Sequence, residues 1–296
     1  MTNSVNNSFV GVINVYKEAG FTSHDVVSVM RKITKTKRIG HTGTLDPDAE
    51  GVLPICIGRA TKFAEYLTAN DKTYIADLVL GITTDTGDIS GNILTKHEAE
   101  IKCENIESIL KTFTGDILQT PPMYSAIKIG GKKLYELARK GITVERKPRP
   151  VTIYSIKIIN KLTNGYSIEV SCSKGTYIRS LCEDIGKAIG CGGTMGKLLR
   201  TKSGMFSIEN TARLEEIKKT AESGLLNDLI LPVDKVLPYP TCKIKPDGLI
   251  SALNGNPLPF NLIDGCFNDK CWLWSDDKMI GLYKREANKL RPEVML

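Results

Sequence analysis

An aspartate in a glycine-rich loop is the first residue of this sequence that could do chemistry. Asp46 stands in the stretch Gly-His-Thr-Gly-Thr-Leu-Asp-Pro, directly ahead of an apolar run that begins at Val52. The proline at 47 restricts the backbone of Asp46 to extended conformations. A restricted carboxylate can serve as a nucleophile when a neighbouring cation keeps it ionised. The alternative is that Asp46 only caps a turn.

Other residues could complete a site around Asp46. Gly40 and Gly43 are expected to let the backbone of its loop turn tightly. Tyr74, Tyr177 and Arg179 are polar residues that lie next to predicted apolar strands. The sequence holds no P-loop, no dinucleotide fingerprint and no zinc-protease motif, so nothing in it calls for a nucleotide cofactor.

Histidine and cysteine usage argues against a metal centre. The chain has 3 histidines and 8 cysteines, and it contains no Cys-x-x-Cys pair. Asp85 and Asp88 stand in a turn-rich stretch that lacks the length and the distal glutamate of a calcium loop, which favours a plain loop. We therefore expect neither metal nor cofactor, and most cysteines should be small buried apolar residues.

The basic residues are concentrated in two segments. The chain of 296 residues carries a net charge of +7. Between residues 120 and 150, eight basic residues face two acidic ones, which gives this segment a net charge of +6. The second segment, Arg31 to Arg38, holds five basic residues and no acidic one. Such patches indicate a polyanionic partner, most simply a nucleic acid, although solvated faces are the alternative.

The hydrophobic pattern predicts the elements that position these residues. Strands are expected at 9–17, 52–58, 72–81, 151–175 (a hairpin that turns at Asn164-Gly165) and 197–210, and helices at 22–35, 60–67, 104–113, 177–190 and 214–224. Thr22 and Asp25 have the spacing of a capping box. This mixture without strict βαβ alternation predicts an α+β fold around a mixed or antiparallel sheet with flanking helices.

The pattern changes after a proline-rich stretch at 232–240. The residues beyond it form short alternating segments with nearly balanced charge, which predicts a small β-rich module. We expect one domain over residues 1–235 and a second over 236–296. The chain has no apolar run of about 18 residues and no secretory signal pattern, so we expect a cytoplasmic protein that does not cross a membrane.

Several segments of the sequence resemble those of a known family. The segments GHTGTLDPDAEGVLPICIGRATKF, DKTYIADLVLGITTDTGD and SKGTYIRSLCEDIG are similar to the signatures of the bacterial TruB-type tRNA pseudouridine-55 synthases, and TPPMYSAIKIGGKKLYELARKG and LLRTKSGMF match the same family in pattern. The resemblance runs from about Val10 to Pro232. It implies a pseudouridine synthase fold followed by a PUA-like RNA-binding module at the C-terminus.

The resemblance also implies an activity and a set of roles. The family isomerises uridine in the T-loop of tRNA to pseudouridine by base flipping, without metal or cofactor. By resemblance Asp46 is the nucleophile and Arg179 pairs with it, while Tyr74 stacks on the target base and relays a proton. The resemblance further implies that Tyr177 and Leu198 line the base pocket, that His41 and Lys62 contact RNA, and that the basic insertion at 120–150, including Lys132 and Lys133, clamps the T-arm.

One departure and two rival functions remain. Family members often carry Lys-Pro-x-Gly near the N-terminus, whereas this chain has Glu18 in place of the proline. The first rival is the guide-RNA-dependent synthase of archaea and eukaryotes, which works with protein partners. The second is a tRNA-folding chaperone without turnover. The basic insertion and the compact C-terminal module favour a stand-alone, monomeric enzyme acting on the T-arm of tRNA, without an obligate protein partner.

Overall fold

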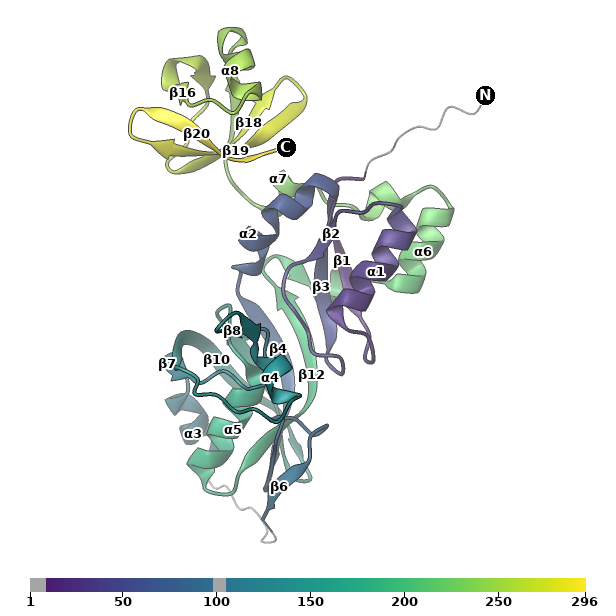
Figure 1. Ribbon diagram of the computed structural model, residues 1–296, viewed down its shortest axis with the longest axis vertical. Coiled ribbons are helices and arrows are strands. Elements are labelled where there is room, and N and C mark those ends of the chain that lie inside the picture. Colours follow the sequence, from purple (N-terminus) through teal and green to yellow (C-terminus); the bar gives the residue numbers. More distant parts are fainter. Residues whose placement is uncertain (1–8, 98–104) are drawn as a thin grey trace.

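A long mixed sheet forms the body of the molecule. The structure is a computed structural model that describes residues 9–97 and 105–296. The main strand order is β14-β1-β3-β12-β4-β11-β10-β7, with β2 paired to β3 and β13 paired to β12 (Figure 1). The strands are β1 (Gly11–Lys17), β2 (Ile39–His41), β3 (Glu50–Ile57), β4 (Lys72–Leu80), β7 (Gly115–Gln119), β10 (Arg149–Leu162), β11 (Gly165–Cys172), β12 (Gly193–Ser203), β13 (Phe206–Ser207) and β14 (Ala212–Arg213).

Within the described residues, four helices pack against one face of this sheet and share one apolar core with it. They are α1 (Ser23–Thr34), α3 (Ile106–Thr112), α5 (Ile178–Ile189) and α6 (Leu214–Glu222). Helix α1 begins as predicted, because Thr22 and Asp25 form the capping box. Helix α5 ends at Gly190, whose φ of 87° is the left-handed conformation that favours glycine at a helix end.

Strands β1 and β3 are buried on both faces because successive side chains point to opposite sides. Ile13 and Leu53 belong to the core that contains the four helices. Val12 and Val52, one residue earlier on each strand, belong to a second apolar cluster on the opposite face. That second cluster is covered by the 3₁₀ helix Gly58–Phe63, by α2 (Ala64–Thr68) and by α7 (Val233–Val236).

The two halves of the large sheet meet at a short seam. Strand β12 pairs with β4 antiparallel over most of its length, but its parallel pairing with β3 is limited to Leu199 opposite Glu50 and Arg200 opposite Gly51. Gly51 has a φ of 105°, and a Cβ atom there would lie 2.2 Å from the Arg200 carbonyl oxygen. Only glycine therefore permits this close approach of the two strands.

The C-terminal residues form a separate sheet with the order β16-β20-β19-β18-β15-β17, drawn at the top of Figure 1. Its strands are β15 (Thr241–Ile244), β16 (Leu258–Pro259), β17 (Ile263–Asp264), β18 (Lys270–Ser275), β19 (Lys278–Glu286) and β20 (Lys289–Met295), and α8 (Leu249–Leu253) packs beside them. Trp272 is fully buried and its ring centroid lies 5.1 Å from that of Phe63. The C-terminal module thus shares the second apolar cluster with the large domain.

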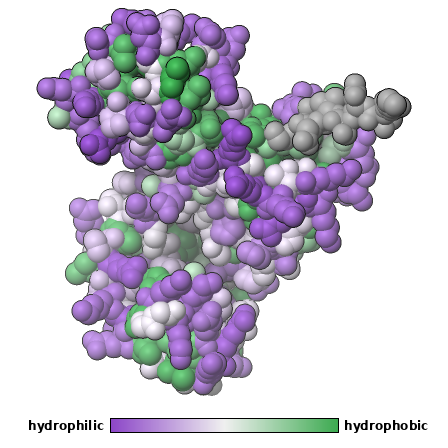
Figure 2. Space-filling model, turned by 45° about the horizontal axis from the view of Figure 1, so that its top comes forward, coloured by the Kyte–Doolittle hydropathy of each residue, from purple (hydrophilic) through white to green (hydrophobic). Residues whose placement is uncertain are grey.

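The basic insertion forms a small substructure in front of the large sheet. It contains the hairpin β8 (Lys128–Ile129) and β9 (Lys132–Lys133) and the short helix α4 (Leu134–Ala138), which Figure 1 draws over β4 and β12. Another hairpin, β5 (Ile82–Thr84) and β6 (Ile93–Lys96), extends beyond β4. Figure 2 shows a largely hydrophilic face that is hollowed between the C-terminal module and the lobe below it.

The predicted α+β fold with a mixed sheet and a small β-rich C-terminal module is confirmed. The predicted hairpin also forms, but its turn is Thr163-Asn164, and Gly165 is the first residue of β11. Gly165 is required there because a Cβ atom would lie 1.9 Å from the Leu78 carbonyl oxygen of the neighbouring strand. Within the described residues, no helix is both long and apolar enough to cross a membrane.

Most of the cysteines lie in the core, as predicted. Of the seven cysteines in the described residues, five are buried, namely Cys56, Cys172, Cys182, Cys242 and Cys271. Burial raises the pKa of the Cys56 thiol to about 12 and that of Cys172 to about 11. These thiols therefore behave as small apolar groups at neutral pH. Cys103 lies outside the described residues.

Candidate active site

The loop that carries Asp46 is fixed by hydrogen bonds along its backbone. The Ser23 hydroxyl, at the start of α1, accepts from the Leu45 amide at 2.9 Å and donates to the Leu45 carbonyl at 3.2 Å. The Thr42 amide donates to the Pro54 carbonyl, and the Ala49 amide donates to the Asp46 carbonyl. A loop held at so many points presents its carboxylate in one position.

Two buried cations bind carbonyl oxygens of the same loop. Nζ of Lys17 donates to the Pro47 carbonyl at 2.9 Å and to the Ala49 carbonyl at 2.6 Å. Arg200, from the sheet seam, donates to the carbonyls of Gly43 and Thr44 at 3.1 and 3.4 Å. The two side chains thus hold the loop on either side of Asp46 in the sequence.

Of the two loop glycines, only Gly43 adopts a conformation that favours glycine. Its φ is 134°. Gly40 instead lies in β2, pairs with Cys56 and has no positive φ, so the expectation that it provides a tight turn is wrong. The position that needs glycine is Gly51, at the seam described above.

Arg179 pairs with Asp46, as predicted. Nε of Arg179 lies 3.1 Å from Oδ2 of Asp46, and Nη2 donates to Oδ1 at 3.3 Å. This is a two-point contact of a planar guanidinium with a carboxylate. The Arg179 side chain is only 6% exposed, whereas that of Asp46 is 38% exposed. The carboxylate is therefore open to a substrate while its cation lies behind it.

Helix α5 places Arg179 at its first turn, and the sheet edge holds that turn. The side chain of Gln119, at the end of β7, accepts from the Tyr177 amide at 2.8 Å and donates to the Tyr177 carbonyl at 3.0 Å. The Ser180 hydroxyl donates to the Thr120 carbonyl at 2.9 Å. Since Thr120 begins the basic insertion, the start of the insertion is tied directly to the start of α5.

Beyond Asp46, Arg179 also contacts Thr86, Asp88 and Tyr124. Nη1 donates to the Thr86 carbonyl at 3.1 Å and lies 3.9 Å from Oδ2 of Asp88, and Nη2 donates to the Tyr124 carbonyl at 2.8 Å. A guanidinium with this many acceptors has little freedom to turn. Its orientation toward Asp46 is therefore set by the whole arrangement rather than by the ion pair alone.

Tyr74 lies on β4 beside Arg200 and is 9% exposed. Burial raises the pKa of its phenol, while the Arg200 guanidinium lowers it. The phenol is therefore protonated at neutral pH, and its ring lies in the apolar core that also contains Leu45. The structure thus brings Tyr74 to the seam where the Asp46 loop is held.

The electrostatics of Asp46 reflect two opposing influences. Burial raises the pKa of its carboxyl, the guanidinium of Arg179 lowers it, and the neighbouring Asp88 raises it. Burial dominates, so the pKa lies above the usual range of an aspartate. His41 shows the converse effect, because burial and the nearby Arg200 lower the pKa of its imidazole. His41 is therefore neutral at neutral pH.

The remaining predicted residues fall into two groups. Tyr177 and Leu198 are half-buried near Arg179 and the seam, and Leu198 packs against the apolar core. Lys132 and Lys133 lie on β9 of the basic insertion. Lys62 lies elsewhere, on the 3₁₀ helix Gly58–Phe63, where its Nζ donates to the Met295 carbonyl at 2.6 Å. The structure thus ties Lys62 to the C-terminal module rather than to the Asp46 loop.

Sequence reasoning missed four residues of this site: Lys17, Asp88, Gln119 and Arg200. Of these, Asp88 stands in the stretch that the sequence analysis interpreted as a plain loop. Its carboxylate is bonded by the Thr86 and Ser90 hydroxyls, and Asp85 is bonded by Asn92. Among the described residues, no group of histidine, cysteine, aspartate and glutamate side chains could hold a metal ion.

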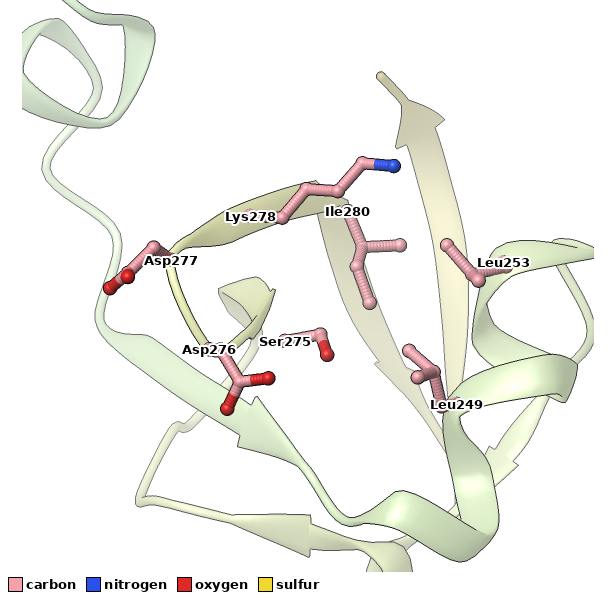
Figure 3. Close-up of a pocket in the computed structure, with 7 residues that line it drawn as sticks. All are labelled: Leu249, Leu253, Ser275, Asp276, Asp277, Lys278 and Ile280. Atoms are coloured by element: carbon pink, nitrogen blue, oxygen red, sulfur yellow. The ribbon is translucent and has the colours of Figure 1, made fainter.

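A hollow of about 460 Å³ lies in the C-terminal module, between α8 and the β18–β19 turn. In Figure 3, Leu249, Leu253 and Ile280 form its apolar side, and the Asp277 carboxylate points away from them. It contains none of the predicted site residues. It is therefore separate from the chemistry around Asp46.

The chain matches family models over most of its length. Residues 31–178 match the model described as TruB family pseudouridylate synthase (N terminal domain), and residues 179–238 match tRNA pseudouridylate synthase B C-terminal domain. The chain is similar to the tRNA pseudouridine synthase B of Alkaliphilus oremlandii, with 49% identity over 86% of this chain and 85% of the relative. The protein of the same name from Lachnoclostridium phytofermentans is 46% identical over 94% and 96%.

Solved structures show the same architecture. The chain is similar to a chain in a crystal structure of a Cbf5-Nop10-Gar1 complex, with a TM-score of 0.74 and 28% identity, covering 97% of this chain and 84% of that chain. A chain in the structure of an H/ACA RNP bound to a substrate RNA containing 2'-deoxyuridine gives a TM-score of 0.72 at 25% identity, with the same coverage. From the family models and these relatives together, the chain belongs to the TruB family of pseudouridylate synthases.

Proposed function

We propose that this protein converts uridine-55 in the T-loop of tRNA to pseudouridine and that Asp46 is its nucleophile. The single observation that carries the role of Asp46 is its geometry. A partly exposed carboxylate makes a two-point contact with a buried guanidinium, next to a tyrosine at the seam of the sheet. Family membership supports the reaction, and the relatives' name supports tRNA as the substrate.

The reaction is an isomerisation that needs no electrons from outside. The bond between N1 and C1′ breaks, the uracil turns, and a bond between C5 and C1′ forms; C5 then loses a proton and N1 gains one. An ionised Asp46 can attack C1′ or promote a glycal intermediate, and both routes need its negative charge. Arg179 supports that charge, because the guanidinium lowers the pKa that burial has raised.

The target base must leave its stack in the RNA to reach Asp46. Tyr74 offers an aromatic ring in exchange, and its protonated phenol can relay a proton. Tyr177 and Leu198, both half-buried, would line the pocket of the flipped base. The neutral imidazole of His41, which ends β2 three residues after the basic segment Arg31 to Arg38, would contact the flipped-out nucleotides.

The remaining contacts to RNA would be electrostatic. Lys132 and Lys133 stand on a hairpin in a segment of net charge +6, which suits phosphates rather than bases. Lys62 would add a contact near the C-terminal module. We propose that the enzyme acts as a monomer in the cytoplasm and needs no guide RNA or protein partner, because the chain carries its own basic insertion.

Replacement of Asp46 by asparagine tests the proposal. Asp46→Asn keeps the size of the side chain and its ability to accept hydrogen bonds, but it removes the charge and the nucleophile. We expect no pseudouridine in a single-turnover assay on T-arm RNA, with folding and filter binding nearly unchanged. A turn cap predicts the opposite, since asparagine caps as well as aspartate. Product at a rate near that of the wild type would refute the nucleophilic role.

A further inference from the structure

Arg200 is a buried arginine without a carboxylate partner among the described residues. Arg200 as a whole is only 1% exposed. The guanidinium is instead satisfied by backbone oxygens, with Nε donating to the Val52 carbonyl at 2.7 Å, Nη2 to Gly43 at 3.1 Å and Nη1 to Thr44 at 3.4 Å. Burial of a cation costs desolvation free energy, so a buried arginine at this position is expected to have a specific role.

The three acceptors lie on both sides of Asp46 in the chain. Gly43 and Thr44 precede Asp46 in the loop, and Val52 follows it on β3. The guanidinium therefore links the incoming loop to the outgoing strand, which closes the backbone around the carboxylate. A Cβ atom on Gly43 would lie 3.7 Å from Nη1 of Arg200, so loop and guanidinium are in close contact.

The same side chain borders Tyr74. In the register of β12 and β4, Arg200 stands opposite Tyr74, and in the register of β12 and β3 it stands opposite Gly51. Arg200 thus lies where β4, which carries Tyr74, and β3, which follows the Asp46 loop, both pair with β12. The effect of the guanidinium on the pKa of the Tyr74 phenol agrees with this proximity.

We infer that Arg200 is a positioning residue that fixes the Asp46 loop relative to Tyr74. In that position, the Asp46 carboxylate and the Tyr74 ring contact the same flipped nucleotide. Arg179 orients the carboxylate itself, and Arg200 acts through the backbone of the loop. This inference rests on the proposed role of Asp46. Small displacements of a reacting group are expensive, because a shift of about 1 Å can cost about 100-fold in rate.

Arg200→Lys separates positioning from stability. Lysine keeps the charge but lacks the planar fork that reaches three acceptors. We expect the T-arm hairpin to bind with less than about twofold change, while the single-turnover rate constant falls about 100-fold. The rate constant is measured with folded enzyme in saturating excess over the hairpin, and the folded fraction is measured separately by circular dichroism. A merely structural role would lower the folded fraction and leave the rate constant of the folded enzyme unchanged.

Ile217→Ala provides the matched control. Ile217 is fully buried on α6 in the same core, but it contacts neither the loop nor β12 through hydrogen bonds, and its truncation leaves a cavity. This variant should lose stability and keep the wild-type rate constant at temperatures where it is folded. If Arg200→Lys does not fold, Arg200→Gln carries the same test, because glutamine retains amide donors without a buried charge.

The possible outcomes are distinct. A wild-type rate constant in a folded Arg200 variant overturns the inference, and so does an equal loss of rate in Ile217→Ala. If Asp46→Asn is inactive while Arg200→Lys is normal, only the positioning role fails. If Asp46→Asn remains active, the proposed nucleophile fails, whatever Arg200 does.

Discussion

Nε of Arg179 lies 3.1 Å from a carboxylate oxygen of Asp46, and this is the one direct ion pair of Asp46 among the described residues. Burial pulls the pKa of Asp46 upward, and Arg179 is the first of the charges that oppose it. The ionised fraction of Asp46 is lost as the pH falls through its pKa. Arg179 therefore determines how far into the acidic range the site keeps its charge.

Removal of this cation should shift the acid limb of the activity profile. Arg179→Met leaves burial unopposed, so the pKa of Asp46 rises further and the fall of activity begins at higher pH. The loss of single-turnover rate relative to wild type should therefore be larger at pH 6 than at pH 8. Rate measurements between pH 5 and pH 9 check this.

Arg179→Lys is the matched variant for that profile. It keeps a positive charge but loses the two-point geometry, so the rate should fall about 100-fold or more at every pH, with an acid limb nearer to that of the wild type. Superimposable profiles of the methionine variant and the wild type, after scaling, would contradict the electrostatic role of Arg179.

The basic insertion should bind RNA through phosphates. The double charge reversal Lys132→Glu, Lys133→Glu should weaken T-arm binding and flatten the dependence of log Kd on log salt by about 1 for each lost contact. Lys132 should dominate, because it is exposed, whereas Nζ of Lys133 already donates to the Tyr135 hydroxyl at 3.3 Å. Filter binding between 50 and 300 mM salt measures the slope.

Lys218 and Lys219 on α6 serve as the control for this charge reversal. Both are exposed, and each pairs with a glutamate of its own helix. Their reversal changes the net charge by the same amount but leaves the insertion intact. If both double variants change the salt slope equally, the effect belongs to the net charge of the protein rather than to the insertion.

The sequence identified the ion pair of the site but not the residues that hold it. Asp46 and Arg179 stand in recognisable motifs, and Thr22 with Asp25 has the spacing of a helix cap. Lys17 and Arg200 could not be found in this way. A lysine or arginine in a strand is normally exposed, and nothing in its spacing indicates burial against backbone carbonyls.

Strand register explains the remaining errors. The expectation for Gly40 rested on composition alone, whereas Gly51 is required only because β3 and β12 approach each other at that residue. Asp88 is part of the site because β4 and the start of α5 bring its loop against Arg179. Contacts between residues this far apart in the chain, such as Asp88 with Arg179 and Gly51 with Arg200, leave no local pattern in the sequence.

The T-arm hairpin should be a sufficient substrate. The predicted contacts centre on one flipped base and on the basic insertion, both within the large domain. Single-turnover rates on the hairpin and on the full tRNA should therefore agree within about tenfold, a difference of about 1.4 kcal/mol in activation free energy. A folded hairpin that yields no product, beside a full tRNA that reacts, would disprove this.

Lys17 should make the free energy of unfolding depend on pH in the alkaline range. The residue is fully buried, and burial lowers the pKa of its amine from 10.5 to about 8, although Asp48, Glu50 and Asp46 oppose the shift. Between pH 8 and pH 10.5 the unfolded chain therefore holds a proton on Lys17 that the folded protein has released. Stability rises with pH wherever the unfolded state binds more protons, so this group contributes an increase over that interval.

Lys17→Met removes the titrating group. The difference in free energy of unfolding between wild type and variant should therefore grow in favour of the wild type from pH 7.5 to pH 10, by up to about 3 kcal/mol. Urea unfolding at several pH values measures it. Lys218→Met, at a residue whose side chain is 66% exposed, should run parallel to the wild type. If Lys17→Met also runs parallel, the amine does not titrate in this interval, and its contribution would lie only in the carbonyl contacts to Pro47 and Ala49.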